Sequence, residues 1–190
     1  MKKILPIILC VFVHVFSSYS QTKNNDSIIR QIAVLKAEKT FSLTLDPGGN
    51  TSKLLAVSEN FSDNEARKSG ILAMNFAAGV FYAGDSLQSS PERILFTFWV
   101  LTKKPRFAAS HGLRVFAGDE IMDVGDGRYS ARARDDMEYL NFELPRETIA
   151  KIARQSNVRL ALGEHEFTFT GEQLKTLANL LILSEVQSGK

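Results

Sequence analysis

The sequence predicts an α+β fold, an antiparallel hairpin-rich β-sheet or sandwich with C-terminal helices packed on it. Short segments in which apolar and polar residues alternate follow one another along the chain, and Gly- or Asp-containing turns separate them. Apolar residues at helical spacing are clearest in the last third. Strands that follow strands directly argue against a doubly wound parallel sheet.

The first elements expected are a short helix and two short strands. Asp26 or Ser27 can cap a helix whose apolar face carries Ile28, Ile32 and Leu35. The segment 40–45 then alternates as a half-buried strand, the turn residues 46–50 end it, and 53–57 form a second strand. A polar loop is expected over 58–69.

Two longer apolar segments follow. Residues 71–82 suit either a buried helix or a strand, and the strand is favoured because Gly70 and Gly84 bracket it. Residues 94–101 are apolar on both faces apart from Thr97, which predicts a central strand covered on both sides, with Trp99 buried.

The rest of the chain predicts three hairpins and two helices. Thr170 and Gln173 have the spacing of a capping box, which opens the last helix. The expected elements are strands 113–116 and 120–124, strands 129–134 and 139–144, a helix over 147–155, strands 158–162 and 167–169, and a helix after Thr170.

Residues 1–20 have the pattern of a secretory signal peptide. Lys2 and Lys3 precede an apolar run of about a dozen residues, which is too short for a bilayer that needs roughly 20. Small residues precede Gln21, where cleavage is expected. The predicted organisation is therefore a signal peptide over 1–20, a polar segment with a short helix over 21–38, and one α+β domain over 39–190.

Removal of the signal peptide changes the composition in two ways. Lys2 and Lys3 leave with it, so the 23 basic residues fall to 21, equal to the 21 acidic ones. A neutral chain has no overall field to attract nucleic acid. The single Cys, Cys10, also leaves, which excludes disulfides, a thiol nucleophile and thiolate metal sites. No stable membrane insertion is expected after cleavage.

A row of arginines is the strongest candidate site. Arg128, Arg132 and Arg134 share one face of a predicted strand with Ser130, and guanidinium groups in a row can hold phosphate, sulfate or carboxylate. Alternatively, these arginines form the ordinary solvent-exposed face of a sheet, with Glu138 or Glu143 as acidic cross-strand partners. Lys103, Lys104 and Arg106 form a second basic cluster, interpreted as a loop at a strand end.

Acidic and histidine residues give weaker candidates. Asp119, Asp123 and Asp126 could supply oxygens to a calcium ion, but the spacing of an EF-hand is missing and an Asp-Gly turn explains the same residues. His165 alternates with two glutamates on a predicted hairpin, which favours a solvated tip. No metal or cofactor is predicted, and no GxSxG, HExxH or dinucleotide motif is present.

The function expected from these observations is a secreted or periplasmic, non-enzymatic binding domain of the bacterial cell envelope. Its partner would be a protein or another envelope component, bound through the sheet surface. Two alternatives stay open. One is a carbohydrate- or anion-active hydrolase that uses the acidic 119–126 region or the arginine row. The other is a carrier of a small apolar ligand, which would explain the 13 Phe residues.

Overall fold

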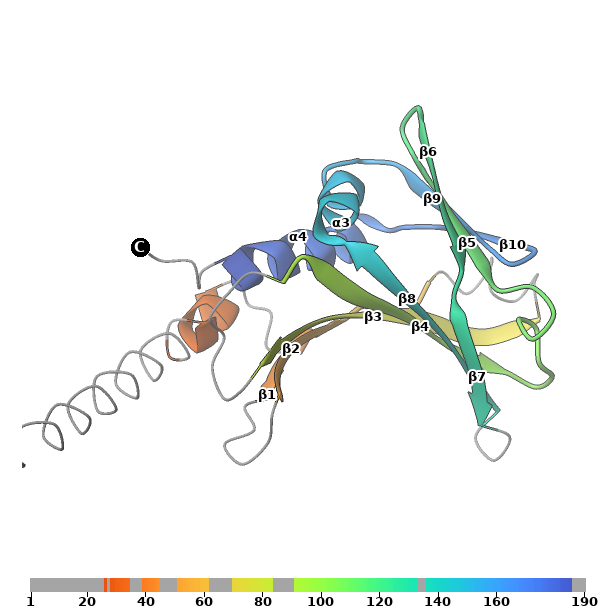
Figure 1. The fold of residues 1–190 in the computed structure, drawn as a ribbon, viewed down its shortest axis with the longest axis horizontal. Coiled ribbons are helices and arrows are strands. Elements are labelled where there is room, and N and C mark those ends of the chain that lie inside the picture. Colours follow the sequence, from red (N-terminus) through yellow and green to blue (C-terminus); the bar gives the residue numbers. More distant parts are fainter. Residues whose placement is uncertain are drawn as a thin grey trace, which may run out of the picture.

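The strands form two antiparallel sheets (Figure 1). The computed structural model describes residues 26, 28–34, 39–44, 51–61, 70–83, 91–132 and 136–185. The predicted signal peptide over 1–20, the turn over 46–50 and Arg134 lie outside the described residues. Within them, the α+β class and its antiparallel pairing are confirmed.

The larger sheet has six strands in the order β1-β2-β3-β4-β8-β7. The segment 71–82 is the long strand β3, as the bracketing glycines predicted, and β4 is central. The bounds are β1 Phe41–Thr44, β2 Thr51–Val57, β3 Ile71–Ala83, β4 Arg93–Thr102, β7 Arg128–Arg132 and β8 Met137–Pro145.

The smaller sheet has four strands in the order β10-β9-β5-β6. Its bounds are β5 Gly112–Ala117, β6 Glu120–Asp126, β9 Val158–Leu162 and β10 His165–Thr168. Only Gly127 separates β6 from β7, so the chain passes from one sheet to the other there (Figure 1). A Cβ at Gly127 would lie 2.6 Å from the Phe142 ring, so this crossing requires glycine.

Two helices of the C-terminal region pack on the inner face of the six-stranded sheet: α3 (Arg146–Ala153) and α4 (Gly171–Glu185). The capping box is confirmed, because Gln173 N donates to Thr170 Oγ1 and Thr170 N donates to Gln173 Oε1, at 3.1 and 2.9 Å. The Arg146 guanidinium donates to the Leu181 carbonyl at 2.8 Å and so satisfies the C-terminal end of α4. Among the described residues, no helix is long and apolar enough to cross a membrane.

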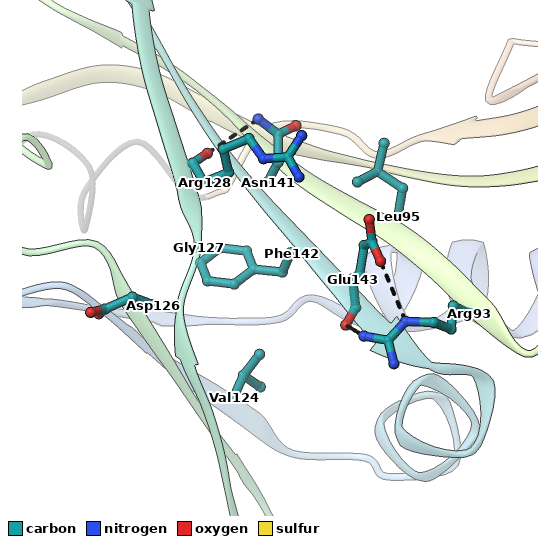
Figure 2. A pocket seen from close by; sticks show the side chains of 9 residues that line it. All are labelled: Arg93, Leu95, Val124, Asp126, Gly127, Arg128, Asn141, Phe142 and Glu143. Atoms are coloured by element: carbon teal, nitrogen blue, oxygen red, sulfur yellow. Dashed lines mark hydrogen bonds and ion pairs between the residues drawn. The ribbon is translucent and has the colours of Figure 1, made fainter.

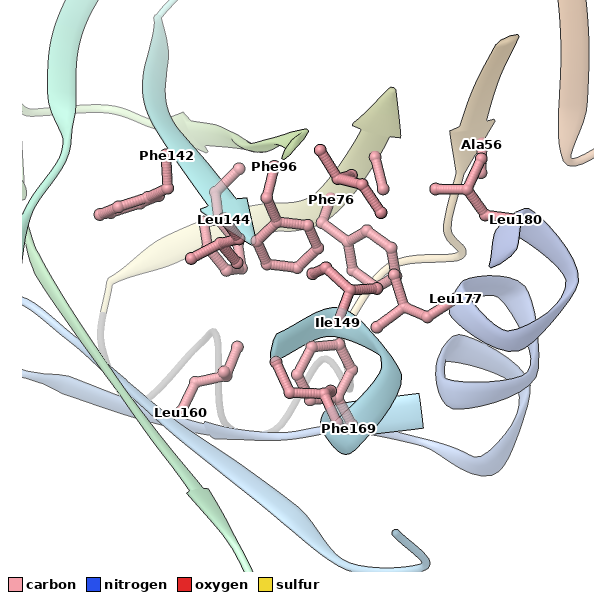
Figure 3. Close-up of a cluster of buried hydrophobic side chains, with 14 of the residues drawn as sticks. Ala56, Phe76, Phe96, Phe142, Leu144, Ile149, Leu160, Phe169, Leu177 and Leu180 are labelled. Carbon is pink, nitrogen blue, oxygen red and sulfur yellow. The ribbon is translucent and has the colours of Figure 1, made fainter. Parts of the chain in front are cut away.

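The core lies between this inner face, the helices and the smaller sheet (Figure 3). Phenylalanine rings from both sheets fill it, with centroids 4.9 to 6.5 Å apart; they are Phe61, Phe76, Phe96, Phe98, Phe142, Phe167 and Phe169. Ile28 and Ile32 of the helical residues 28–34 join the same cluster. The excess of Phe is therefore explained by aromatic packing in the core.

One expectation about β4 is wrong. Its even-numbered residues 94–100 point inward; Phe96 and Phe98, for example, are fully buried. Leu95, Trp99 and Leu101 on the other face stay half-buried, so β4 is fully covered on one side only. The helices and the smaller sheet dock on the inner face, and no described helix or strand packs on the outer one.

Candidate functional site

The outer face of the six-stranded sheet carries an apolar band across four neighbouring strands. Cross-strand pairs place these side chains next to one another: Trp99 pairs with Tyr139, and Leu101 pairs with Met137. The band consists of Leu55 on β2, Phe81 on β3, Leu95, Trp99 and Leu101 on β4, and Met137 and Tyr139 on β8. These side chains are half-buried except Phe81, which is 45% exposed.

Polar groups lie within the band and at its margins. Thr97 Oγ1 donates to Asn141 Oδ1 at 2.8 Å between β4 and β8, and both residues belong to the outer face. Arg93 Nε lies 3.4 Å from Glu143 Oε2, and both side chains are 60% exposed. The outer face therefore has two apolar groups, one around Leu95 and one around Trp99, with the Thr97–Asn141 pair between them and charged residues at the edge.

Arg128 and Arg132 of the arginine row lie on this same face, as the alternation of β7 predicted. Arg128 pairs with Asn141 and Arg132 with Met137, both outward-facing positions of β8. Four residues of strand separate the two arginines by roughly 13 Å, so each has its own surroundings. The Arg132 guanidinium lies 5.6 Å from the centroid of the Tyr139 ring.

The acidic partners considered for this row are wrong. Glu138 pairs with Ala131 on the inner face and is buried, while Glu143 forms its ion pair with Arg93. Among the described residues, neither Arg128 nor Arg132 has a carboxylate partner.

Arg128 lines a groove of about 740 Å³ at the point where β7 leaves β8 and continues as β6 (Figure 2). The groove is lined by Arg93, Leu95, Val124, Asp126, Gly127, Arg128, Asn141, Phe142 and Glu143. Asn141 Nδ2 donates to the Arg128 carbonyl at 3.3 Å. The carboxylates of Asp126 and Glu143 point in different directions (Figure 2). They do not converge as a pair of catalytic carboxylates would.

A buried carboxylate is the electrostatic centre of the inner side. Glu138, 2% exposed, accepts hydrogen bonds from Thr102 Oγ1, from the backbone N–H groups of Arg106 and Phe107, and from Tyr129 Oη, all at 2.9 to 3.0 Å. Burial raises the pKa of Tyr129, and the hydrogen bond to Glu138 and its negative charge raise it further. The His111 ring stacks on Tyr129 at 5.8 Å.

Most of the predicted acidic region 119–126 is a strand and not an Asp-Gly hairpin turn. The turn lies at Gly118–Asp119, and 120–126 are the strand β6. The register with β5 shifts near Val124, Gly125 has a φ of +81°, and Asp123 Oδ1 accepts the Gly125 N–H at 3.0 Å. Within the described residues, no group of three or more His, Asp or Glu side chains could hold a metal ion.

The histidine hairpin has the alternation that the sequence predicts. The turn before β10 is Gly163–Glu164, and the His165 ring packs edge-on against buried Phe107 at 5.4 Å. Glu166 on the opposite face pairs with Arg159 at 2.9 Å. These contacts explain the positions of His165 and Glu166 without the need for a bound metal ion.

Sequence reasoning missed the residues that now matter most. The sequence predicts a buried Trp99 and does not single out Tyr139. Because Trp99 directly follows the more apolar Phe98 on a strand, the two side chains point to opposite faces, and this signal could have placed Trp99 on the outer face. Glu138 occupies an inward-facing position of an alternating strand, and this alone indicates a buried carboxylate. Comparison with known proteins found no family model, curated protein or solved structure that matches the chain.

Proposed function

We propose that this chain is an exported, non-enzymatic binding domain that contacts a partner protein of the bacterial cell envelope through the outer face of its six-stranded sheet. The observation that carries the proposal is the apolar band over β2, β3, β4 and β8, on which no described helix or strand packs. Partly exposed apolar side chains that gather on one uncovered face of a folded domain typically mark an interaction surface.

The composition of the face favours a protein as the partner. Aromatic residues, Met and Arg are enriched at the centres of protein interfaces, and Trp99, Tyr139, Met137 and Arg132 lie together here. Trp and Tyr supply a large contact area at a small entropic cost. The ion pair of Arg93 with Glu143 lies at the margin, where a polar rim is expected.

The single tryptophan makes the proposal directly testable. Because Trp99 lies within the band, a bound partner should shift its emission to shorter wavelength and protect it from acrylamide. Affinity capture from envelope extract with the mature chain supplies the candidate, which is then purified and titrated. We expect saturable binding that weakens at least tenfold in Trp99→Ser.

The matched control is Ile121→Ser, which removes an exposed apolar residue of the smaller sheet, 65% exposed, outside the band. Unchanged binding in this control supports the proposed face. A partner whose affinity is the same in Trp99→Ser and in the unsubstituted chain, or that loses affinity only in Ile121→Ser, would overturn the proposal.

The hydrolase alternative predicts a different effect of substituting the carboxylates of the groove. It would need Asp126 and Glu143, the two carboxylates of the groove, and Glu143 is already paired with Arg93. A Glu143→Gln substitution should therefore leave partner binding within a factor of three. A hydrolytic activity of the chain that disappears in Glu143→Gln or Asp126→Asn would replace the binding proposal.

A further inference from the structure

One residue of the arginine row, Arg132, and the basic cluster of Lys103, Lys104 and Arg106 lie at the same end of the six-stranded sheet. Leu101 near the end of β4 pairs with Met137, and Met137 pairs with Arg132 at the end of β7. Adjacent strands lie about 4.8 Å apart, so Arg132 and the residues that follow β4 share one end of the sheet, within roughly 10 Å. This end lies to the right in Figure 1.

A concavity of about 380 Å³ lies at this end of the sheet. It is lined by Gly70, Ile71, Leu72, Lys103, Lys104 and Arg106. Gly70 has a φ of +70°, and a Cβ there would overlap the Arg106 guanidinium. The guanidinium thus lies directly over the chain at Gly70, in a position that only glycine permits.

Hydrogen bonds to a buried carboxylate hold the loop that carries these cations. The buried Glu138 carboxylate accepts the Arg106 and Phe107 backbone N–H groups and the Thr102 hydroxyl. Phe107 is fully buried. Because Thr102 and Arg106 are both held, the intervening residues Lys103 and Lys104 are presented on an anchored loop, which lowers the entropic cost of binding a ligand.

The three cations have no carboxylate partner among the described residues. Elsewhere in the described chain five exposed or half-buried cations are paired: Arg93 with Glu143, Arg146 with Glu185, Lys151 with Glu120, Arg159 with Glu166 and Lys175 with Glu172. Three like charges around one concavity repel each other, and a bound anion removes that repulsion.

We propose that this concavity is a binding site for a phosphate or sulfate group, held by Lys103, Lys104 and Arg106. A guanidinium can bind two oxygens of a tetrahedral oxyanion, while the two ammonium groups supply charge from the sides. The lining of this site contains no residue of the apolar band, so the test of this site does not depend on the proposed protein partner.

Leu72 indicates what the anion is attached to. The register of β3 against β4 shifts between Ile71 and Ala73, which turns the extra residue Leu72 outward, 48% exposed, beside the cations. An apolar side chain next to a cationic pocket suits a phosphate group that is joined to an apolar moiety. Such a group occurs in small phosphate esters and in phospholipid headgroups.

The test is a titration of the isotopically labelled mature chain with inorganic phosphate, followed by backbone amide NMR at constant ionic strength. We expect saturable shifts confined to the amides of Gly70–Leu72, Lys103, Lys104, Arg106 and Phe107. The Lys103→Gln/Lys104→Gln variant should weaken binding at least fivefold, because both side chains are exposed and the loop anchor at Glu138 is untouched.

Two control variants locate the site. Arg114→Gln removes an exposed cation of the smaller sheet and should leave the affinity unchanged. Arg128→Gln removes the far end of the arginine row and should also leave it unchanged, since Arg128 lies at the groove of Figure 2. Shifts that do not saturate, or an affinity that falls with Arg128→Gln and not with the double lysine variant, would overturn the proposal.

Sedimentation with vesicles distinguishes the two sources of the phosphate group. Vesicles of phosphatidylglycerol in phosphatidylcholine should retain the chain if the ligand is a headgroup, and the Lys103→Gln/Lys104→Gln variant should lose this retention. Binding of a short alkyl phosphate without vesicle retention identifies a soluble ester. Both results support the site, whereas vesicle retention that is equal in the double variant contradicts it.

Discussion

The two faces of the six-stranded sheet are made by the same strands and have different surroundings. On β4, Phe96 and Phe98 point inward and are fully buried, whereas Leu95, Trp99 and Leu101 point outward and are half-buried. Both faces are apolar, so apolarity does not distinguish them. What distinguishes them is that α3, α4 and the smaller sheet dock on one face only.

The comparison separates the parts of the chain that hold the fold from those available to a partner. On the inner face the Phe76, Phe96 and Phe98 rings contact one another, and both oxygens of the polar Glu138 accept hydrogen bonds. On the outer face the aromatic Trp99 and Tyr139 are paired across strands but keep accessible surface. Substitutions on neighbouring residues of one strand can therefore test the two roles separately.

The largest difference is expected between Phe98→Ala and Trp99→Ala. Phe98 lies within 6.4 Å of the Phe61, Phe96 and Phe142 ring centroids, so its truncation should lower the free energy of unfolding by about 3–5 kcal/mol. Trp99→Ala should cost about 1 kcal/mol, as expected for a side chain outside the sealed core. Urea unfolding followed by far-UV circular dichroism measures both. Equal losses would show that the outer face is sealed in the same way as the inner one.

A second pair compares two glutamates on β8. Glu138→Gln replaces an acceptor of buried N–H and hydroxyl donors with a partly donating amide, and should lower the free energy of unfolding by about 2–3 kcal/mol. Glu143→Gln on the outer face removes only an exposed ion pair and should cost less than about 0.5 kcal/mol. The same urea experiment checks this order, and a larger loss for Glu143→Gln would contradict it.

The third prediction concerns the helix that covers the inner face. Thr170→Ala removes the hydroxyl that accepts the Gln173 N–H at the start of α4 and should cost about 1 kcal/mol, measured by thermal or urea unfolding. Thr170→Ser keeps the acceptor and serves as the control. If both variants are equally destabilised, the methyl group of Thr170 matters more than its hydrogen bond.

The smallest effect is expected at Tyr82 on the inner side of β3. Burial raises the pKa of Tyr82 to about 12 from an ordinary 10.0, against the opposing effect of Arg146. The unfolding free energy should hold below about pH 10 and fall as the pH rises through 12, because only the folded state retains this proton. Its hydroxyl has no hydrogen-bond partner among the described residues. Tyr82→Phe should therefore be neutral or slightly stabilising at pH 7. Above pH 10 the urea midpoint of this variant should decrease less than that of the unsubstituted chain. An equal decrease would contradict the raised pKa of Tyr82.

Much of the secondary structure could be predicted because its causes are local. Alternation along 113–116, 139–144 and 158–162 fixes which side chains share a face, and each segment is a strand in the structure. The capping box at Thr170 and Gln173 acts over three residues and is present as predicted. The strand over 71–82 was the ambiguous case, and bracketing by glycine indicated it correctly.

The candidate sites could be predicted only in part. The outward direction of Arg128 and Arg132 follows from strand alternation, but their cross-strand neighbours depend on the register with β8. The register of β8 with β4, in which Glu138 pairs with Val100, places Glu138 under the loop of Lys103 and Lys104, more than 30 residues earlier in the chain. No local pattern encodes such a contact.

The sequence by itself determined the class of the fold, the alternating faces of its strands and the glycine and capping signals at their ends, because each depends on neighbours a few residues apart. Only the tertiary structure decided which apolar face is covered, which loop lies over the buried Glu138 carboxylate and which basic residues line a common concavity. These outcomes depend on how sheets and helices dock, since burying one face of a sheet leaves the other for solvent or a partner.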